Sequence, residues 1–299
     1  MGFLQIAIME NKKPVYGGQA VVEGVMIRGE HHVSIAVRRP DGTIASKREP
    51  LNPIYTGFWR KIPILRGILV LTETMMLGIN ALIYSANVGA EAEGEEIGKV
   101  SIAITLLFSL MFAIGLFFLL PVFASKGFEG IVSNDIYTNA IEGIIRLLLL
   151  VGYIFLIGRL SEIKRVFMYH GAEHMTIHAQ EHGVPLDISS IRKYPTAHPR
   201  CGTAFLLTVM VIAVFVFTFV GREPLWWLLI SRVVLIPLIA AVSYEVIRFA
   251  GGHDNKFIVR IITWPNIALQ SLTTRQPEDE QIEIAVEALK GAIEADRSI

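Results

Sequence analysis

The sequence predicts a mainly α-helical polytopic membrane protein. We expect about four transmembrane helices, one further interfacial or buried helix, and a small N-terminal β-rich cytoplasmic domain. Of the 299 residues, 53% are hydrophobic and only 18% are charged, a balance that is not typical of soluble globular domains. The apolar residues are grouped into blocks. Residues 203–221 contain no charged side chain, and a stretch of this length can cross the hydrocarbon core as a helix.

Three further blocks are long and apolar enough to span. Residues 100–124 carry no charge, and residues 225–249 begin with two tryptophans, which is typical of a segment that enters at the membrane interface. Residues 140–160 contain Glu142 and Arg146. These two side chains are one helical turn apart, so we expect them to neutralise each other.

A fifth segment, residues 62–87, has helical length but places Arg66 and Glu73 on one face. It is either an interfacial helix or a span buried among the others. Lys and Arg are concentrated in the first 61 residues, in the loop 161–202 and in the tail after residue 250. The positive-inside rule therefore places these three segments in the cytoplasm. That arrangement needs an even number of spans, so we expect 62–87 not to cross.

The two ends of the chain are predicted to form cytoplasmic structure. Residues 32–39 alternate as a strand, residues 40–42 form a tight turn, and residues 43–48 return as the partner strand. After Pro277, acidic residues are followed by an apolar stripe at helical spacing, which predicts a helix that docks on the β-rich domain. The predicted organisation is a β-rich domain (1–61), an interfacial or re-entrant helix (62–87), the first two spans (100–160), a cytoplasmic His-rich loop (161–202), the last two spans (203–249) and a cytoplasmic tail with an amphipathic helix (250–299).

Composition excludes several classes of function. A single cysteine, Cys201, rules out an intramolecular disulfide and fits a reducing compartment. The net charge of zero says nothing about nucleic acid. Basic residues are not interleaved with aromatic ones, so we expect no nucleic-acid partner. The apolar run at residues 3–9 is too short for a signal peptide. The expected partners are the lipid bilayer and a membrane-protein or lipid substrate, and nothing indicates an oligomeric state.

The loop 161–202 contains a doubled motif, His170-Gly-Ala-Glu173-His174 followed by His178-Ala-Gln-Glu181-His182. In a helix, residues four apart advance by about 40°, so the four histidines would line one stripe. Two imidazoles at i and i+4 can share one zinc ion, and a neighbouring carboxylate can act as a general base. The order His-x-x-Glu-His is that of inverted zinc peptidases.

Topology brings other polar residues to the depth of this motif. His198, Arg200 and Cys201 directly precede the third span, and Glu245 lies near the cytoplasmic end of the fourth. Charged groups at that depth are costly to bury unless they are paired, and a metal is one way to pair them. The predicted zinc ligands are His170 and His174, with Glu245 or His198 as the third. Further candidates are His178 as an auxiliary ligand, Cys201 as a ligand, and Glu173 and Arg200 as catalytic residues.

The first copy of the motif is predicted to matter more than the second. It follows the second span directly and is anchored at the membrane face, whereas Gly183 and Pro185 end the helix just beyond His182. Three alternatives stay open. Histidine and glutamate at this spacing often form only surface pairs. A cysteine such as Cys201 is more often a small buried residue than a ligand, and Glu245 could be a structural partner of Arg248. The protein could also be a non-catalytic scaffold, biogenesis factor, or metal or proton carrier, in which Glu142, Arg146 and Arg232 serve within the spans.

Taken together, these segments resemble the YqhQ-like family of bacterial inner-membrane proteins of unknown function. The resemblance implies a multi-pass protein of the bacterial inner membrane and a metal-dependent enzyme, but no substrate. It rests on residues 17–26 (GGQAVVEGVM), 169–174 (YHGAEH), 198–203 (HPRCGT), 243–245 (SYE) and 272–277 (LTTRQP).

Overall fold

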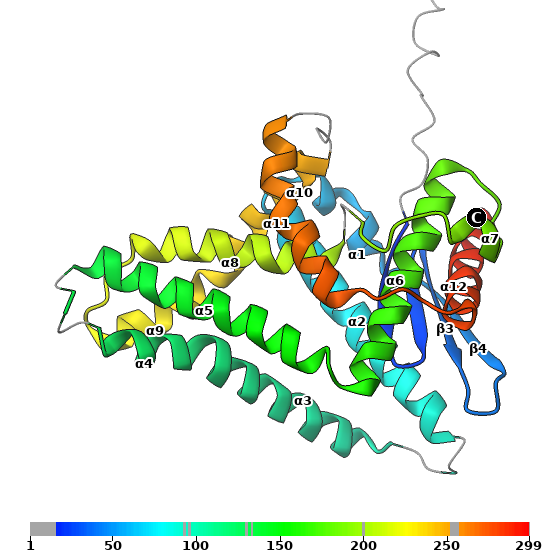
Figure 1. Cartoon of the computed structure of the whole chain (residues 1–299), viewed down its shortest axis with the longest axis horizontal. Helices are drawn as coiled ribbons and strands as arrows, with labels where there is room; N and C mark the ends of the chain where they lie inside the picture. The colour runs from blue at the N-terminus through cyan, green and yellow to red at the C-terminus, as the bar shows by residue number, and fades with distance from the viewer. Residues whose placement is uncertain are drawn as a thin grey trace, which may run out of the picture.

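The computed structural model describes residues 16–91, 94, 97–128, 131–132, 134–198, 201–251 and 257–298. Helices dominate, and the strands form one small sheet near the N-terminus. Figure 1 shows an elongated molecule, with α3, α4, α5, α8 and α9 at one end and the sheet with α6 and α12 at the other. The strands are β1 (Gly17–Val21), β2 (Gly24–Arg28), β3 (His32–Arg38) and β4 (Ile44–Pro50). The helices are α1 (Pro53–Thr56), η1 (Phe58–Lys61), α2 (Leu65–Glu91), α3 (Lys99–Ile114), the π-helical turn η2 (Gly115–Leu119), α4 (Leu120–Lys126), α5 (Asp135–Ile157), α6 (Ser161–His182), α7 (Ile188–Ile191), α8 (Gly202–Thr218), α9 (Leu225–Val234), α10 (Ile236–Gly251), α11 (Phe257–Thr273) and α12 (Asp279–Arg297).

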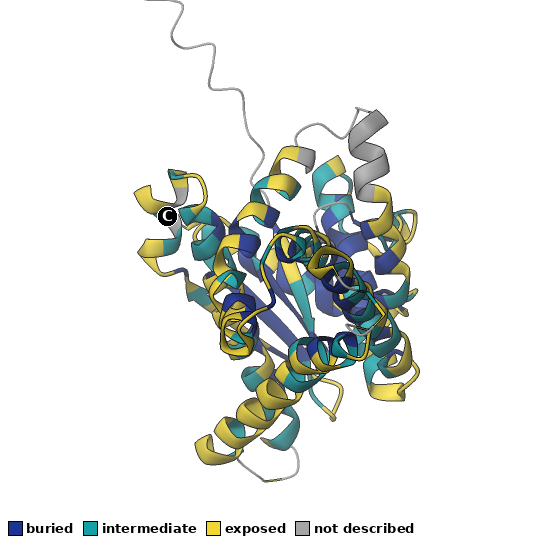
Figure 2. Ribbon diagram, turned by 90° about the vertical axis from the view of Figure 1, so that its left-hand side faces the viewer, coloured by how far each residue is buried: buried dark blue, intermediate teal, exposed yellow. Residues whose placement is uncertain are grey.

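The sheet is an antiparallel meander in the order β1-β2-β3-β4. The hairpin expected at residues 32–48 is confirmed: Arg38 pairs with Ile44, and Gly42 adopts φ 86° in the turn. Both faces of the sheet are covered, because alternate side chains of β2 pack in opposite directions. Val25 and Ile27 join a core with α6 and α12, whereas Met26 faces α2. Figure 2 shows the strands largely buried and surrounded by helices.

The predicted C-terminal docking helix is present as α12, which packs on the sheet and on α6. A second helix of the C-terminal segment was not predicted. Helix α11 lies in the segment that the sequence assigned to a cytoplasmic tail, and it packs against α8 and α5. Pro265 inside this helix removes a backbone donor and interrupts the pattern by which a helix is recognised.

Three helical segments are long and apolar enough to cross a membrane: α2, the continuous segment α3–α4, and α5. The pair α9–α10, bent by 41°, would make a fourth, and residues 205–218 of α8 form a shorter apolar helix. In α3 no residue is buried, and its exposed side chains include Leu107, Phe108 and Met111. An apolar helix exposed on all sides suits lipid and not water.

Buried charges join the helices at the end of the molecule opposite the sheet. The expected pairing of Glu142 with Arg146 is confirmed, because the Arg146 guanidinium donates to Glu142 Oε1 at 2.7 Å. Arg222 and Arg232 also donate to the Glu142 carboxylate, at 2.9 and 3.1 Å. All four side chains are buried. Because a buried charge is stable only when paired, this cluster fixes α5 against α9 and the α8–α9 loop.

Candidate metal centre

Helix α6 carries the four motif histidines on one stripe, as their spacing predicts. The helix ends at His182, and Gly183 takes the left-handed conformation (φ 69°) that closes a helix C-terminus. The ring centroids of His170 and His174 are 4.4 Å apart, and those of His178 and His182 are 6.3 Å apart. Each copy of the motif therefore holds a pair of neighbouring imidazoles.

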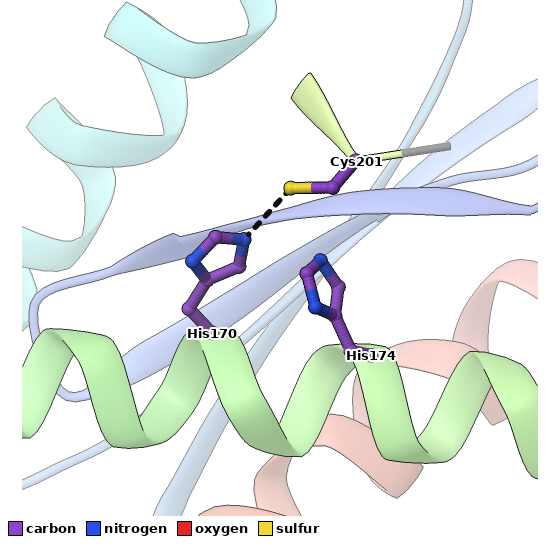
Figure 3. A group of neighbouring side chains, drawn as sticks. All are labelled: His170, His174 and Cys201. Atoms are coloured by element: carbon purple, nitrogen blue, oxygen red, sulfur yellow. Dashed lines mark hydrogen bonds between the residues drawn. The ribbon is translucent and has the colours of Figure 1, made fainter. Parts of the chain in front are cut away.

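The structure brings His170, His174 and Cys201 together. Each offers one ligand atom, and the three atoms lie within 4.8 Å of one another. His170 Nε2 is 3.2 Å from Cys201 Sγ, and Figure 3 shows both rings directed from α6 toward the sulfur. Cys201 is the N-cap of α8, where its sulfur accepts a hydrogen bond from the Thr203 amide. We call these three residues the cysteine triad.

Backbone carbonyls orient the two rings of the cysteine triad. His170 Nδ1 is 2.8 Å from the Thr273 carbonyl oxygen, and His174 Nδ1 is 2.6 Å from that of Thr196. A carbonyl only accepts, so each Nδ1 carries the proton and each Nε2 keeps its lone pair. This is the usual way in which a metal-binding histidine is held.

A second group contains His178, Glu181 and His198, whose ligand atoms also lie within 4.8 Å of one another. His198 Nε2 is 3.4 Å from Glu181 Oε2. His178 Nε2 donates to the Ala197 carbonyl at 2.9 Å. We call these three residues the carboxylate triad. The ring of His198 is 5.7 Å from that of His174, so the two triads are neighbours.

Glu173 is buried beside the cysteine triad. Its Oε2 lies 3.4 Å from His174 Nε2, and its carboxylate accepts a hydrogen bond from the Gly18 amide of β1. A side chain at position 18 would overlap with Glu173, so glycine is needed for this approach. Burial raises the pKa of Glu173 and lowers the pKa of His174 and His178. A raised pKa makes the Glu173 carboxylate a stronger proton acceptor, and neutral imidazole is the form that binds metals.

The β1–β2 turn ties the sheet to α6. Glu23 sits in this turn with a positive φ of 51°. Its carboxylate accepts from Arg165 Nε at 2.6 Å and from the Tyr169 hydroxyl at 3.0 Å. Arg165 and Tyr169 directly precede the motif, so this contact fixes the register of α6 on the sheet and holds Gly18 against Glu173.

Replacing Glu23 with glutamine is expected to lower the stability by roughly 0.5–1 kcal/mol at neutral pH, as for a part-exposed ion pair. The hydrogen bonds from Arg165 hold the pKa of Glu23 below its ordinary value of 4.5. The stabilisation is therefore complete above the unfolded-state pKa and is lost as the pH falls through the lower folded-state pKa. Thermal unfolding in detergent between pH 7 and pH 3 should show a constant gap between wild type and variant at neutral pH, which closes as the pH falls below 4.5. The exposed Glu30→Gln is the control; a gap that stays constant with pH would contradict this account.

Several predicted site residues lie elsewhere. Glu245 was expected as a third zinc ligand, but its carboxylate accepts two hydrogen bonds from Arg66 of α2, one of them at 2.6 Å. Neither group of candidate ligands found in the described part of the chain includes it. The positive charge of Arg66 pairs with this carboxylate, and the spacing of residues in the sequence could not reveal that pairing. His178 and His198 belong to the carboxylate triad and not to the first site. Arg200 lies outside the described residues.

Other site residues were missed. Glu181 was seen only as part of the motif. Gln270 of α11 holds the backbone of His198 from both sides, accepting from its amide at 2.8 Å and donating to its carbonyl at 2.9 Å. The carbonyls of Thr196, Ala197 and Thr273 orient the rings. Main-chain acceptors leave no signature in a single sequence, so no motif could have identified them.

A family model described as "Protein of unknown function (DUF1385)" matches residues 62–295. The chain belongs to this family. "Uncharacterized protein YqhQ" from Bacillus subtilis (strain 168) is 36% identical over 290 residues, which cover 92% of this chain and 91% of the relative. The resemblance found in the sequence is therefore confirmed. No solved structure matches the chain.

The DUF1385 match contains both triads, because α6, α8 and the loop between them lie within residues 62–295. It begins after β4, so the sheet residues Gly18 and Glu23 lie outside it.

Proposed function

We propose that this DUF1385 protein is a membrane-embedded zinc-dependent hydrolase that works at the cytoplasmic face of the bacterial inner membrane. The observation that carries the proposal is the cysteine triad: two imidazoles with their lone pairs on Nε2, and a thiol, all with ligand atoms within 4.8 Å. Peptide bonds of membrane proteins and ester or amide bonds of lipids are both suitable substrates for such a site.

The donor set fits zinc. Zinc takes histidine nitrogen and cysteine sulfur, and catalytic sites use three protein ligands with one position left open. The residues that would hold the ion are His170, His174 and Cys201. Their support is rigid, because Thr196 and Thr273 fix the rings and Thr203 donates to the sulfur.

Zinc bound there would lower the pKa of a water molecule to about 7 and would polarise a carbonyl or phosphoryl oxygen. Glu173 lies next to the triad, at 3.4 Å from His174, and could hold the proton that is removed from water. The sheet excludes solvent from this carboxylate, since Gly18 packs directly on it.

The shared core of the sheet, α6 and α12 supports the predicted topology. These three elements pack together, so they lie on one side of a membrane. An even number of crossings must then separate β4 from α6. If α3–α4 and α5 both cross, α2 does not, although it is long enough. In addition, the second half of α2 lies on the sheet, through Ala81 and Val88.

Cysteine labelling in intact cells should test this topology. Ile131→Cys, at a position that is 81% exposed beyond α4, is expected to react with a membrane-impermeant maleimide. Lys193→Cys, exposed in the loop after α7, should react only after the cells are permeabilised. The native Cys201 is buried and gives a low background. Labelling of Lys193→Cys in intact cells would contradict the predicted orientation, because it would place the loop 161–202 outside the cell.

Replacing Glu173 with glutamine is expected to abolish hydrolysis while leaving bound zinc unchanged. Glutamine keeps the size of the side chain but cannot take a proton from water. The loss should be at least about 100-fold, the lower end of general acid–base contributions. The measurement compares products in membrane lipid and peptide extracts incubated with wild type or variant, alongside the zinc content. Glu162→Gln, exposed in the first turn of the same helix, is the control. Equal products from Glu173→Gln and wild type would exclude a catalytic role for Glu173.

One observation favours a second candidate, a carrier that passes metal ions at the membrane face. Five imidazoles follow one another with centroid spacings between 4.4 and 6.3 Å, in the order His170, His174, His198, His178 and His182. In this candidate function, an ion would pass from each ring to the next. A Glu173→Gln variant with full cellular function and normal metal content would favour this candidate over the hydrolase.

A further inference from the structure

The second copy of the motif contributes to a group of candidate metal ligands of its own. His178 and Glu181 come from the last turns of α6, and His198 comes from the segment that leads into α8. Their ligand atoms lie within 4.8 Å of one another, as closely as those of the cysteine triad. We infer that the carboxylate triad is a second divalent-cation site, next to the first and different from it in chemistry. This inference rests on the proposed function only in that the first site is also a metal site.

Neighbouring groups also hold the two histidines of the carboxylate triad in place. His178 Nε2 donates to the Ala197 carbonyl, which leaves Nδ1 as the nitrogen with the lone pair. The ring also stacks on Tyr194, with 6.0 Å between centroids and 9° between planes. Gln270 clamps the backbone of His198 from both sides. Ligands that are fixed before the ion arrives bind it more tightly.

A simple ion pair explains only part of this arrangement. His198 and Glu181 lie 3.4 Å apart and could pair without a metal. The third member, His178, would then bring a second imidazole to the same point, only 4.5 Å from the His198 ring. Two protonated imidazoles at that distance would repel each other, whereas two neutral ones and a carboxylate can share a cation.

The two sites should select ions differently. Two histidines and a carboxylate are a donor set of zinc hydrolases and of sites for divalent iron. The cysteine triad offers a soft thiolate, which favours zinc and disfavours harder ions. We therefore expect the carboxylate triad to accept zinc, cobalt and manganese, and the cysteine triad to exclude manganese.

Cobalt(II) distinguishes the two sites, because a cobalt–thiolate bond gives a near-ultraviolet charge-transfer band that nitrogen and oxygen ligands do not give. Full-length wild type in detergent, titrated with cobalt alone, is expected to bind two ions per chain. Glu181→Gln should bind one and keep the band, whereas Cys201→Ser should bind one and lose it. Glu162→Gln is the control and should bind two. Glutamine could still act as a ligand, so Glu181→Ala is measured as well and should also bind one ion and keep the band. Circular dichroism checks that the helices of this variant are intact.

The outcomes separate the second site from the first. One ion per chain in wild type, with the band present and unaffected by either Glu181 variant, would overturn the second site and leave the first. Two ions in wild type and in Cys201→Ser would overturn the cysteine site alone. An absence of bound cobalt and of bound zinc in wild type would overturn both.

Discussion

Replacing His174 with alanine is expected to abolish tight metal binding at the cysteine triad, whereas replacing His182 should leave it nearly intact. His174 is 2% exposed, and its Nδ1 is fixed by the Thr196 carbonyl. His182 lies in the last turn of α6, and its Nδ1 donates to the His178 carbonyl. In the part of the chain that the structure describes, neither triad includes His182. Loss of a residue that only supports a ligand costs about 10–100-fold in affinity, so loss of His174 itself should cost more than about 100-fold.

Zinc competition against a chromophoric chelator measures both variants, and the cobalt–thiolate band reports the first site alone. His182→Ala is a matched control, because it removes the same ring from the same stripe of the same helix. Equal losses in the two variants would mean that the position along α6 does not matter. The argument for the anchored first copy would then be wrong.

Local periodicity was sufficient to predict α6 and its stripe of histidines. Residues four apart lie on one face of any α-helix, whatever surrounds the helix. The hairpin of β3 and β4 and the docking helix α12 were predictable for the same reason, since alternation and helical spacing are properties of short segments. The helix end at Gly183 was equally local.

The sequence named Glu245, His198 and Cys201 as candidates beside His170 and His174, but it could not decide among them, because the choice depends on how separate helices pack. Glu245 and Cys201 both follow the motif at the cytoplasmic end of a predicted span, and sequence placed them at one depth. The structure directs Glu245 to Arg66 of α2 and leaves Cys201 next to His170. This difference depends on the packing of α2 against α10, where Gly67 lies in close contact with Ala241. No local pattern in the sequence reports such a contact.

The groups that orient the histidines could not be predicted from the sequence for a different reason. The Thr273 carbonyl that fixes His170 is a main-chain atom at the end of α11, a helix that the sequence did not predict. Helix α11 is largely apolar, but Pro265 near its middle removes a backbone donor, so the segment was not recognised as one continuous helix. Gln270 is fully buried, and its side-chain amide holds the backbone of His198 through two hydrogen bonds.

Replacing Gly171 with alanine is expected to destabilise the protein and to weaken the cysteine triad together. Gly171 lies inside the motif, and a Cβ there would overlap with the carbonyl oxygen of Arg275. That carbonyl cannot turn aside like a flexible side chain, because the Arg275 amide donates to the Phe167 carbonyl of α6 at 2.9 Å. Overpacking of this kind costs about 1–3 kcal/mol, against a gain of up to about 1 kcal/mol from the better helix former.

The same displacement should reach the site, because Thr273 lies two residues before Arg275 and its carbonyl orients His170. We therefore expect Gly171→Ala to lower the thermal midpoint in detergent and also to weaken cobalt binding in the thiolate band. The matched control is Gly152→Ala in the interior of α5, where an added Cβ meets nothing within 4 Å. Because Gly152 has open space, that variant should keep both the midpoint and the affinity. A Gly171→Ala protein with unchanged stability would show that the segment around Arg275 moves freely and cannot be what holds His170 in place.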